Sequence, residues 1–315
     1  MYDLAGWAHA AWPLVKLVFM VSVGLFVGNL IEALHWTRFL ACLASPLARL
    51  GHLSARSAAS FAMAFVSGIT ANTMLAEAYD QGQMSRRELV LSNLFNSLPT
   101  YFLHLPSMVF ITVPLLKTAA VVYLGLTIGA AMLRSAWILC VGRLILPRIA
   151  DKSLTVPDQP RASWHSVIHK TRVRFQRRIK KILLITVPIY ALVQAAHHWG
   201  LFAGAEHFLS THMGWLSWLP PQAMGILVFQ LAAEMSAGMA AAGALLDAGS
   251  LQTKEVVLAL LVGNIISSPM RAFRHQFPYY AGIYKPALAL FLIGASQGLR
   301  VVSLMLCAAV YYWLF

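Results

Sequence analysis

The chain has 315 residues, of which 59% are hydrophobic and only 11% are charged. Soluble domains are about 45–50% apolar and about 25% charged, so this chain has too little polar surface to cover a water-soluble globule. Together with a mean hydropathy of +0.68, the composition excludes a soluble enzyme, a nucleic-acid-binding domain and a disordered protein. It predicts an all-α polytopic membrane protein.

The net charge of +13 is concentrated in one segment. Ten of the 24 Lys and Arg residues fall between Arg148 and Lys181. A basic segment beside long apolar stretches is typical of a cytoplasmic loop that faces anionic lipid, so we expect membrane lipid rather than nucleic acid as its partner. We divide the chain into a first membrane repeat (1–147), a basic cytoplasmic linker (148–180) and a second membrane repeat (181–315), in the inner (plasma) membrane of a bacterium.

Six apolar segments are each long enough to cross a hydrocarbon core of about 30 Å. They are Trp12–Leu34, Ser57–Tyr79, Thr118–Leu146, Ile182–His198, Gln222–Leu246 and Pro286–Phe315. Two amphipathic stretches, His35–Leu50 and Ala203–Met213, are expected at the membrane interface. Each half therefore has about three spanning helices and one interfacial helix.

Proline interrupts two further segments, and proline removes a backbone donor and breaks a helix. These are Ser85–Leu116, with Pro99, Pro106 and Pro114, and Thr253–Ile283, with Pro269 and Pro278. We predict that each forms a re-entrant hairpin of two half-helices, which protein or a wet cavity must surround at membrane depth. The alternative is that each segment crosses the bilayer. Ser85-x-x-Glu88 is a capping box and predicts a helix start.

The two halves contain an internal repeat. Tyr79–Leu91 matches Leu246–Leu258 at a constant offset of 167 residues, and both copies read Asp-x-Gly, then a basic residue followed by Glu. Farther on, Asn93–Pro99 resembles Gly263–Pro269 at an offset of 170. The sequence therefore predicts a duplication whose second copy is about one helical turn longer.

The orientation of the two repeats follows from their Lys and Arg residues. Re-entrant hairpins give three crossings in each half and an inverted second half, whereas spanning segments give four crossings and parallel halves. Outside the linker, the inverted arrangement places five basic residues inside and three outside, and the parallel arrangement places three inside and five outside. The positive-inside rule favours inverted repeats.

These residues resemble a known family, the Gate or nucleoside-recognition membrane proteins, whose repeat also occurs in the membrane part of ferrous-iron permeases. The resemblance lies in the paired Asp-x-Gly…base-Glu segments and in Leu105-Pro106…Leu115-Leu116-Lys117…Tyr123-Leu124-Gly125, and it covers roughly Ser57–Arg143 and Gln222–Arg300. It implies an integral membrane protein of the transporter or gating type, without specifying a substrate. The GTPase domain of the iron permeases has no counterpart, because GxxxxGK[ST] does not occur.

In transporters built from inverted repeats, the substrate binds near the midplane, where broken helices present helix ends and backbone groups. Here this predicts a site at the two hairpin tips. The candidates are Asn93, Asn96, Ser97 and Thr100 in the first tip and Asn264, Ser267, Ser268 and Arg271 in the second. The alternative is that these small polar side chains cap half-helices and join neighbouring helices.

Ionisable residues inside apolar segments are further candidates, because each costs about 2.5–3.5 kcal/mol at a helix centre. They are Glu77, Glu234, Arg134, Arg274 and Arg300. Either they pair with one another and the arginines snorkel from helix ends, or the arginines bind a phosphate or carboxylate through the guanidinium fork. Basic residues outnumber acidic ones in these segments, which favours an anionic ligand.

Three pairs of glycines have the spacing that permits close helix approach. These are Gly24-x-x-x-Gly28, Gly125-x-x-x-Gly129 and Gly294-x-x-x-Gly298. We expect them to pack helices within the chain, with a homodimer as the alternative.

The leading hypothesis is a secondary transporter or flippase that moves an anionic small or lipid-linked solute by alternating access. One alternative is a divalent-cation permease, with Glu77 and Glu234 among its oxygen ligands, although Arg271 would repel a metal. Another is a non-transporting membrane subunit that docks through the linker. No HExxH or Cys/His constellation occurs, so we expect no enzyme activity, metal or cofactor.

Overall fold

The computed structural model describes residues 44, 46–147, 218–232, 235–276, 280 and 283–315, with a few isolated positions elsewhere. These residues are mostly helical and include no strand. The predicted spans Trp12–Leu34 and Ile182–His198 lie essentially outside this part of the chain, as do the linker, the stretch Ala203–Met213 and most of His35–Leu50.

The same order of helices occurs twice, as the sequence repeat predicts. The first half contains α3 (Ala55–Ala64), α4 (Gly68–Asp80), α5 (Arg86–Phe95), α6 (Ser97–Leu116) and α7 (Thr118–Ile145). The second half contains a short 3-10 turn (Pro221–Ala223), then α10 (Met224–Ala232), α11 (Met235–Asp247), α12 (Thr253–His275) and α14 (Pro286–Leu314). In each half, a pair of short helices precedes long helices, and by the sequence offset α12 corresponds to α5 and the first part of α6.

The turns of the two halves also match. Gly82 and Gly249 have φ of +68° and +66°. The N–H groups of each glycine and of the next residue donate to carbonyls three and five residues back, which is the Schellman end of α4 and α11. Lys117 and Lys285, directly before the last helix of each half, have φ of +52° and +68°. These backbone conformations therefore recur at corresponding positions of the two halves.

Helix α5 begins where the capping box predicts. The Ser85 hydroxyl accepts the Glu88 N–H at 3.2 Å, so this prediction is confirmed. The Glu88 carboxylate, however, accepts the N–H of Ser54 at 3.0 Å and thereby joins α5 to the start of α3. In the second half, Gln252 and Glu255 form the reciprocal capping box at the start of α12.

Two predicted spans are wrong as single helices. We expect Ser57–Tyr79 and Gln222–Leu246 each to cross the bilayer, but each contains two short helices that pack against each other, α3 with α4 and α10 with α11. In the first half the chain turns at 65–67, just before Gly68, and glycine is a poor helix former. Helices of 9 to 13 residues are too short to cross a core of about 30 Å.

The first proline-containing segment does not fold as the expected hairpin, and the second does not break at Pro269, while Pro278 lies outside the described residues. Asn96, the residue between α5 and α6, has the helical angles φ −61° and ψ −11°, so the chain continues onward. Pro99 lies in the first turn of α6, where an N–H is not needed, and Pro106 and Pro114 lie within α6. Helix α12 likewise runs through Pro269. A single lost hydrogen bond does not end a helix whose neighbours support it.

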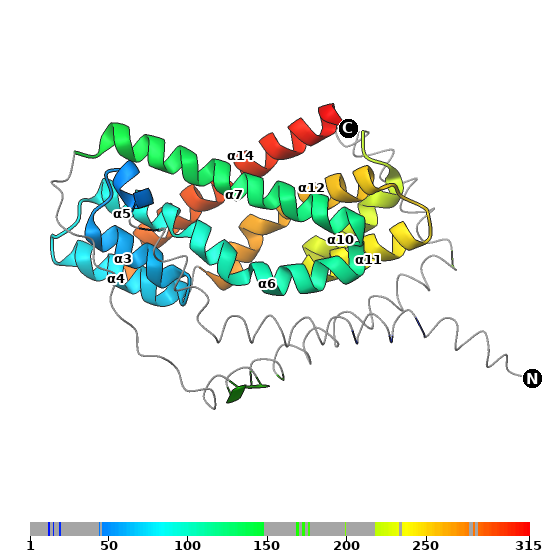
Figure 1. Cartoon of the computed structure of the whole chain (residues 1–315), viewed down its shortest axis with the longest axis horizontal. Coiled ribbons are helices and arrows are strands. Elements are labelled where there is room, and N and C mark those ends of the chain that lie inside the picture. Colours follow the sequence, from blue (N-terminus) through cyan, green and yellow to red (C-terminus); the bar gives the residue numbers. More distant parts are fainter. Residues whose placement is uncertain are drawn as a thin grey trace, which may run out of the picture.

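Three helical stretches of the described chain are long and apolar enough to cross a membrane, namely Arg86–Leu116, Thr118–Ile145 and Pro286–Leu314. Figure 1 shows that α7 and α14, which pack against each other, run in opposite directions, as do α6 and α12. The pair α3 and α4 lies at one end and the pair α10 and α11 at the other. Corresponding helices of the two halves are therefore antiparallel.

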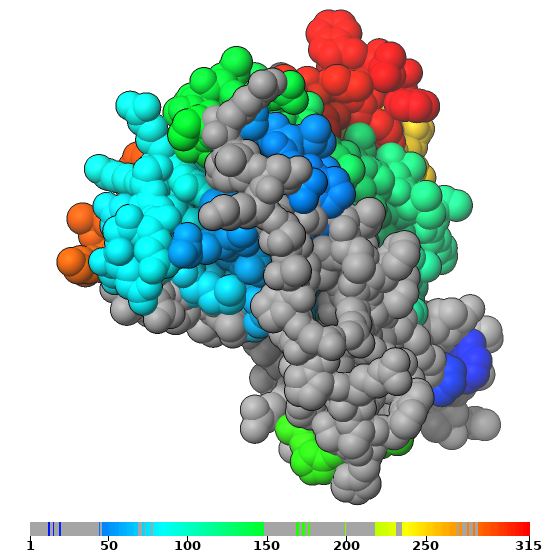
Figure 2. Space-filling model, turned by 60° about the vertical axis from the view of Figure 1, so that its left-hand side comes forward, coloured from blue at the N-terminus to red at the C-terminus, as the bar shows by residue number. Residues whose placement is uncertain are grey.

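Large apolar side chains are exposed along α7 and α14. Trp137 is 61% exposed and Leu144 is 85% exposed. The end of α14, coloured red, stands out from the surface in Figure 2, and its last residues Trp313 and Phe315 are 82% and 79% exposed. Apolar surface of this kind marks contact with lipid or another apolar partner.

The glycine pairs do not pack as expected. A Cβ at Gly125, Gly129, Gly294 or Gly298 would meet no atom of the described residues within 4 Å, so these two pairs make no close helix contact within the described part of the chain. Gly24 and Gly28 lie outside the described residues. Other glycines make the close approaches: a Cβ at Gly142 would lie 2.5 Å from the Gly51 carbonyl oxygen, and one at Gly243 would lie 2.5 Å from that of Leu115.

Replacing Gly142 tests the packing of α7. Gly142→Ala is expected to destabilise the protein by about 1–3 kcal/mol, because the new methyl group overlaps the Gly51 backbone. Gly129→Ala is the matched control in the same helix and is expected to stabilise by about 0.5–1 kcal/mol, since alanine is the better helix former. Thermal unfolding in detergent measures both, and equal stability of the two variants would refute this packing.

Candidate functional site

A cavity of about 410 Å³ lies between the two halves of the chain. Helices α4, α5, α6 and α7 line it from the first half, and α11, α12 and α14 line it from the second. Gly68 and Met235, the first residues of α4 and α11, both line it, and they are 167 positions apart like the sequence repeat. The volume is within the range of about 300–1,000 Å³ that small-molecule sites have.

Most of the candidates from the sequence line this one cavity. They are Asn93, Asn96, Ser97, Thr100, Arg134, Ser268, Arg271 and Arg300. Asn264 and Ser267 are buried and do not line it. Glu234 and the side chains of Glu77 and Arg274 lie outside the described part of the structure.

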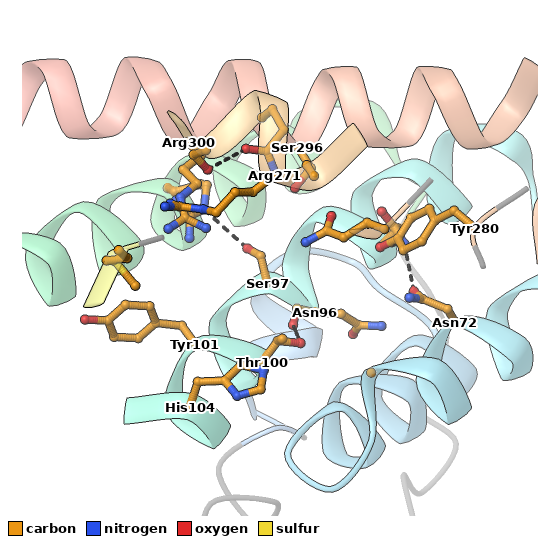
Figure 3. A pocket seen from close by; sticks show the side chains of 18 of the residues that line it. Asn72, Asn96, Ser97, Thr100, Tyr101, His104, Arg271, Tyr280, Ser296 and Arg300 are labelled. Atoms are coloured by element: carbon orange, nitrogen blue, oxygen red, sulfur yellow. Dashed lines mark hydrogen bonds between the residues drawn. The ribbon is translucent and has the colours of Figure 1, made fainter. Parts of the chain in front are cut away.

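Two arginines of the second half converge on one acceptor. Arg271 Nη2 on α12 and Arg300 Nη2 on α14 donate to Asn264 Oδ1 at 3.3 and 3.4 Å. Figure 3 shows their guanidinium groups in the same region of the cavity, near Ser97. Asn264 thus fixes two cationic side chains from the side away from the cavity.

The third arginine comes from the first half. Arg134 on α7 is only 7% exposed; its Nε donates to Ser97 Oγ at 3.3 Å and its Nη1 to Ser303 Oγ at 3.4 Å. The described residues that line the cavity include no Asp or Glu. The oxygens of Asn264, Ser97 and Ser303 are neutral, so these hydrogen bonds orient the guanidinium groups without supplying a negative charge.

The other side of the cavity is a network of amides and phenols. Asn93 Nδ2 donates to Asn72 Oδ1 at 2.8 Å and to the Tyr280 hydroxyl oxygen at 3.2 Å. The Tyr284 hydroxyl donates to Asn72 Oδ1 at 3.2 Å. This network joins α4 and α5 to the segment between α12 and α14, and so connects the two halves.

Several cavity residues are absent from the candidates chosen on sequence. They are Asn72, Tyr101, His104, Gln276, Tyr280, Ser296 and Gln297. Two signals were available: Asn72 is an amide inside an apolar segment, and Tyr280 and Tyr284 have the four-residue spacing of one helix face. Neither signal shows which distant residue each side chain meets.

The chain is similar along almost its whole length to three proteins of Methanocaldococcus jannaschii. Uncharacterized protein MJ0871 is 24% identical over 295 residues, 93% of this chain and 88% of that protein. Uncharacterized protein MJ1556 is 23% identical over 287 residues, covering 90% and 91%, and uncharacterized protein MJ0880 is 21% identical over 277 residues, covering 86% and 88%. No protein-family model and no solved structure matches the chain.

Asn264 tests whether the arginines depend on this acceptor. Asn264→Leu removes the oxygen shared by Arg271 and Arg300 and is expected to destabilise the protein by about 1.5–3 kcal/mol. Asn264→Asp returns an oxygen acceptor and adds a negative charge, so its unfolding temperature in detergent is expected to exceed that of Asn264→Leu. An Asp variant no more stable than the Leu variant would show that the shared acceptor contributes nothing.

Proposed function

We propose that the protein is a membrane transporter whose central cavity binds the anionic group of a small or lipid-linked solute. The observation that carries the proposal is the convergence of Arg134, Arg271 and Arg300 on one cavity whose described lining has no carboxylate. Arg134 is only 7% exposed and its described partners are neutral hydroxyl groups, and a buried guanidinium group is costly without a counter-charge. A phosphate or carboxylate compensates that charge and fits the guanidinium fork with two parallel hydrogen bonds.

The arrangement of the helices supports transport by alternating access. The long helices of the two halves are antiparallel, so if they cross the bilayer, the axis that relates the halves lies in the membrane plane. Inverted-repeat transporters place their site at the interface of the repeats and expose it by rocking one repeat against the other. The cavity here lies between the halves and takes side chains from both.

The proposed location is the plasma membrane, with several crossings and with the basic segment 148–180 on the cytoplasmic side. The resemblance to the Gate proteins agrees with a transporter and remains part of the proposal. A divalent-cation permease is disfavoured, because three guanidinium groups around the cavity repel a metal ion.

A ligand screen on the purified full-length protein tests the anion site. A ligand at 100 times its dissociation constant is expected to stabilise the protein by about 2.7 kcal/mol. The screen compares nucleosides, nucleotides, phosphorylated polyprenols, organic anions and divalent metals by thermal unfolding in detergent. We expect only anionic compounds to shift the unfolding temperature, and Arg271→Glu to abolish that shift and the uptake of the same compound into proteoliposomes.

The matched control is Arg143→Glu, which makes the same change of charge at an exposed residue near the end of α7. This variant is expected to bind and transport like the wild type. A shift produced by divalent metals alone, or an anion shift that survives in Arg271→Glu, would overturn the proposal.

A further inference from the structure

The cavity has two chemically different ends. Figure 3 shows Arg271 and Arg300 on one side, Asn72 and Tyr280 on the opposite side, and Asn96 and Thr100 between them. The arginines offer only hydrogen-bond donors, whereas an amide offers both donors and an acceptor. A solute that fills the cavity therefore meets different requirements at its two ends.

Two residues that line this cavity have a buried side-chain oxygen without a donor. Asn93 and Asn96 line it and are 4% and 5% exposed, and the Oδ1 atom of each is buried with no hydrogen-bond partner among the described residues. Burying a carbonyl oxygen without a donor costs free energy, so each such atom in a folded protein needs an explanation.

The amide nitrogens of both side chains are already engaged. Asn93 Nδ2 donates to Asn72 Oδ1. Asn96 Nδ2 donates to Ser60 Oγ at 2.7 Å, and that hydroxyl in turn donates to the carbonyl of Ala71 at 2.9 Å. These partners fix the orientation of the two amides, so the groups left for a ligand are oxygens and they require a donor.

We propose that the transported anion also carries hydroxyl or amino groups, which donate to Asn93 Oδ1 and Asn96 Oδ1 while its phosphate or carboxylate lies among the arginines. This inference rests on the proposed function and narrows its substrate class to hydroxylated or aminated organic anions, either free in solution or as a lipid headgroup. Inorganic phosphate and simple alkyl phosphates satisfy only the arginine end.

A matched pair of compounds isolates the donor groups. Glycerol 1-phosphate and propyl phosphate have the same anionic group and the same number of carbons, and they differ by two hydroxyls. We expect the full-length protein in detergent to bind glycerol 1-phosphate about tenfold more tightly or better, because each hydrogen bond to a buried acceptor contributes up to about a factor of ten. Isothermal titration calorimetry gives the ratio of the two dissociation constants.

The variant Asn96→Leu removes the oxygen at nearly constant volume. It is expected to lower the ratio several-fold towards one, while the affinity for propyl phosphate stays unchanged. The control Ser60→Ala removes the contact that orients the Asn96 amide but keeps its oxygen, and it is expected to lower the ratio less than Asn96→Leu does. Gln230→Leu is a second control: Gln230 is also buried with no partner for its amide atoms, but it lies against Gly238 and Gly263 and lines no part of the cavity.

A lipid arm distinguishes a headgroup from a free solute. The same comparison is made in detergent micelles with dioleoyl phosphatidylglycerol and dioleoyl phosphatidylpropanol, which differ by the same two hydroxyls. If the substrate is lipid-linked, the hydroxyl preference appears with the lipids and is absent or weaker with the free phosphates. If the substrate is a free solute, the preference for the hydroxylated compound appears with the free phosphates instead. Either result supports the inference that the substrate carries donor groups.

The outcomes separate the two proposals. One outcome is that the hydroxylated and plain compounds bind equally in both arms, with binding lost in Arg271→Glu. This result would support the anion transporter but overturn the proposal that the substrate carries donor groups. Binding of glycerol 1-phosphate that needs Na⁺ in the wild type but not in Asn96→Leu would make the oxygens cation ligands, which also overturns it. If none of the four compounds binds, both the anion transporter and the requirement for donor groups are overturned. The wild-type ratio needs no variant, so the test holds even if Asn96→Leu does not fold.

Discussion

Positive charge inside an apolar molecule is the constraint on which the site depends. Arg134, Arg271 and Arg300 come from three different helices of both halves, and Asn264 and Ser97 hold them with neutral oxygens. Neutral acceptors orient a guanidinium group without cancelling its charge. The three guanidinium groups therefore meet at the cavity only while α7, α12 and α14 pack together, so the site depends directly on the fold.

Local features of the fold could be predicted from the sequence because they depend on neighbouring residues. The Asp-x-Gly turns place Gly82 and Gly249 at positive φ, and the capping box at Ser85 starts α5. The conformation of each of these turns and helix starts is determined by about six neighbouring residues, so a short sequence motif is enough to predict it. The offset of 167 carries over into the structure for the same reason, since equal local sequences make equal turns.

The path of the chain through each half could not be predicted in this way. Hydropathy over Ser57–Tyr79 is the same whether the chain runs straight or folds back into α3 and α4, and only tertiary packing decides. Proline predicted a break at Pro269 that is absent from the structure. Packing against neighbouring helices stabilises α12 by more than the loss of the one hydrogen bond that Pro269 removes. Asn72 and Tyr280 were missed for a related reason: their partners lie in distant segments.

The two pairs of short helices contact the cavity differently, and this difference matters for alternating access. Each half places one pair of short helices at its own end of the molecule, and each pair reaches the shared cavity with the first residue of its second helix, Gly68 or Met235. The two contacts differ. Beside Gly68, Asn72 bonds to α5 and to Tyr284, whereas among the described residues Met235 accepts a weak 3.8 Å contact from the Tyr123 hydroxyl. Under the proposed mechanism, the two repeats therefore break different interactions when they move against each other.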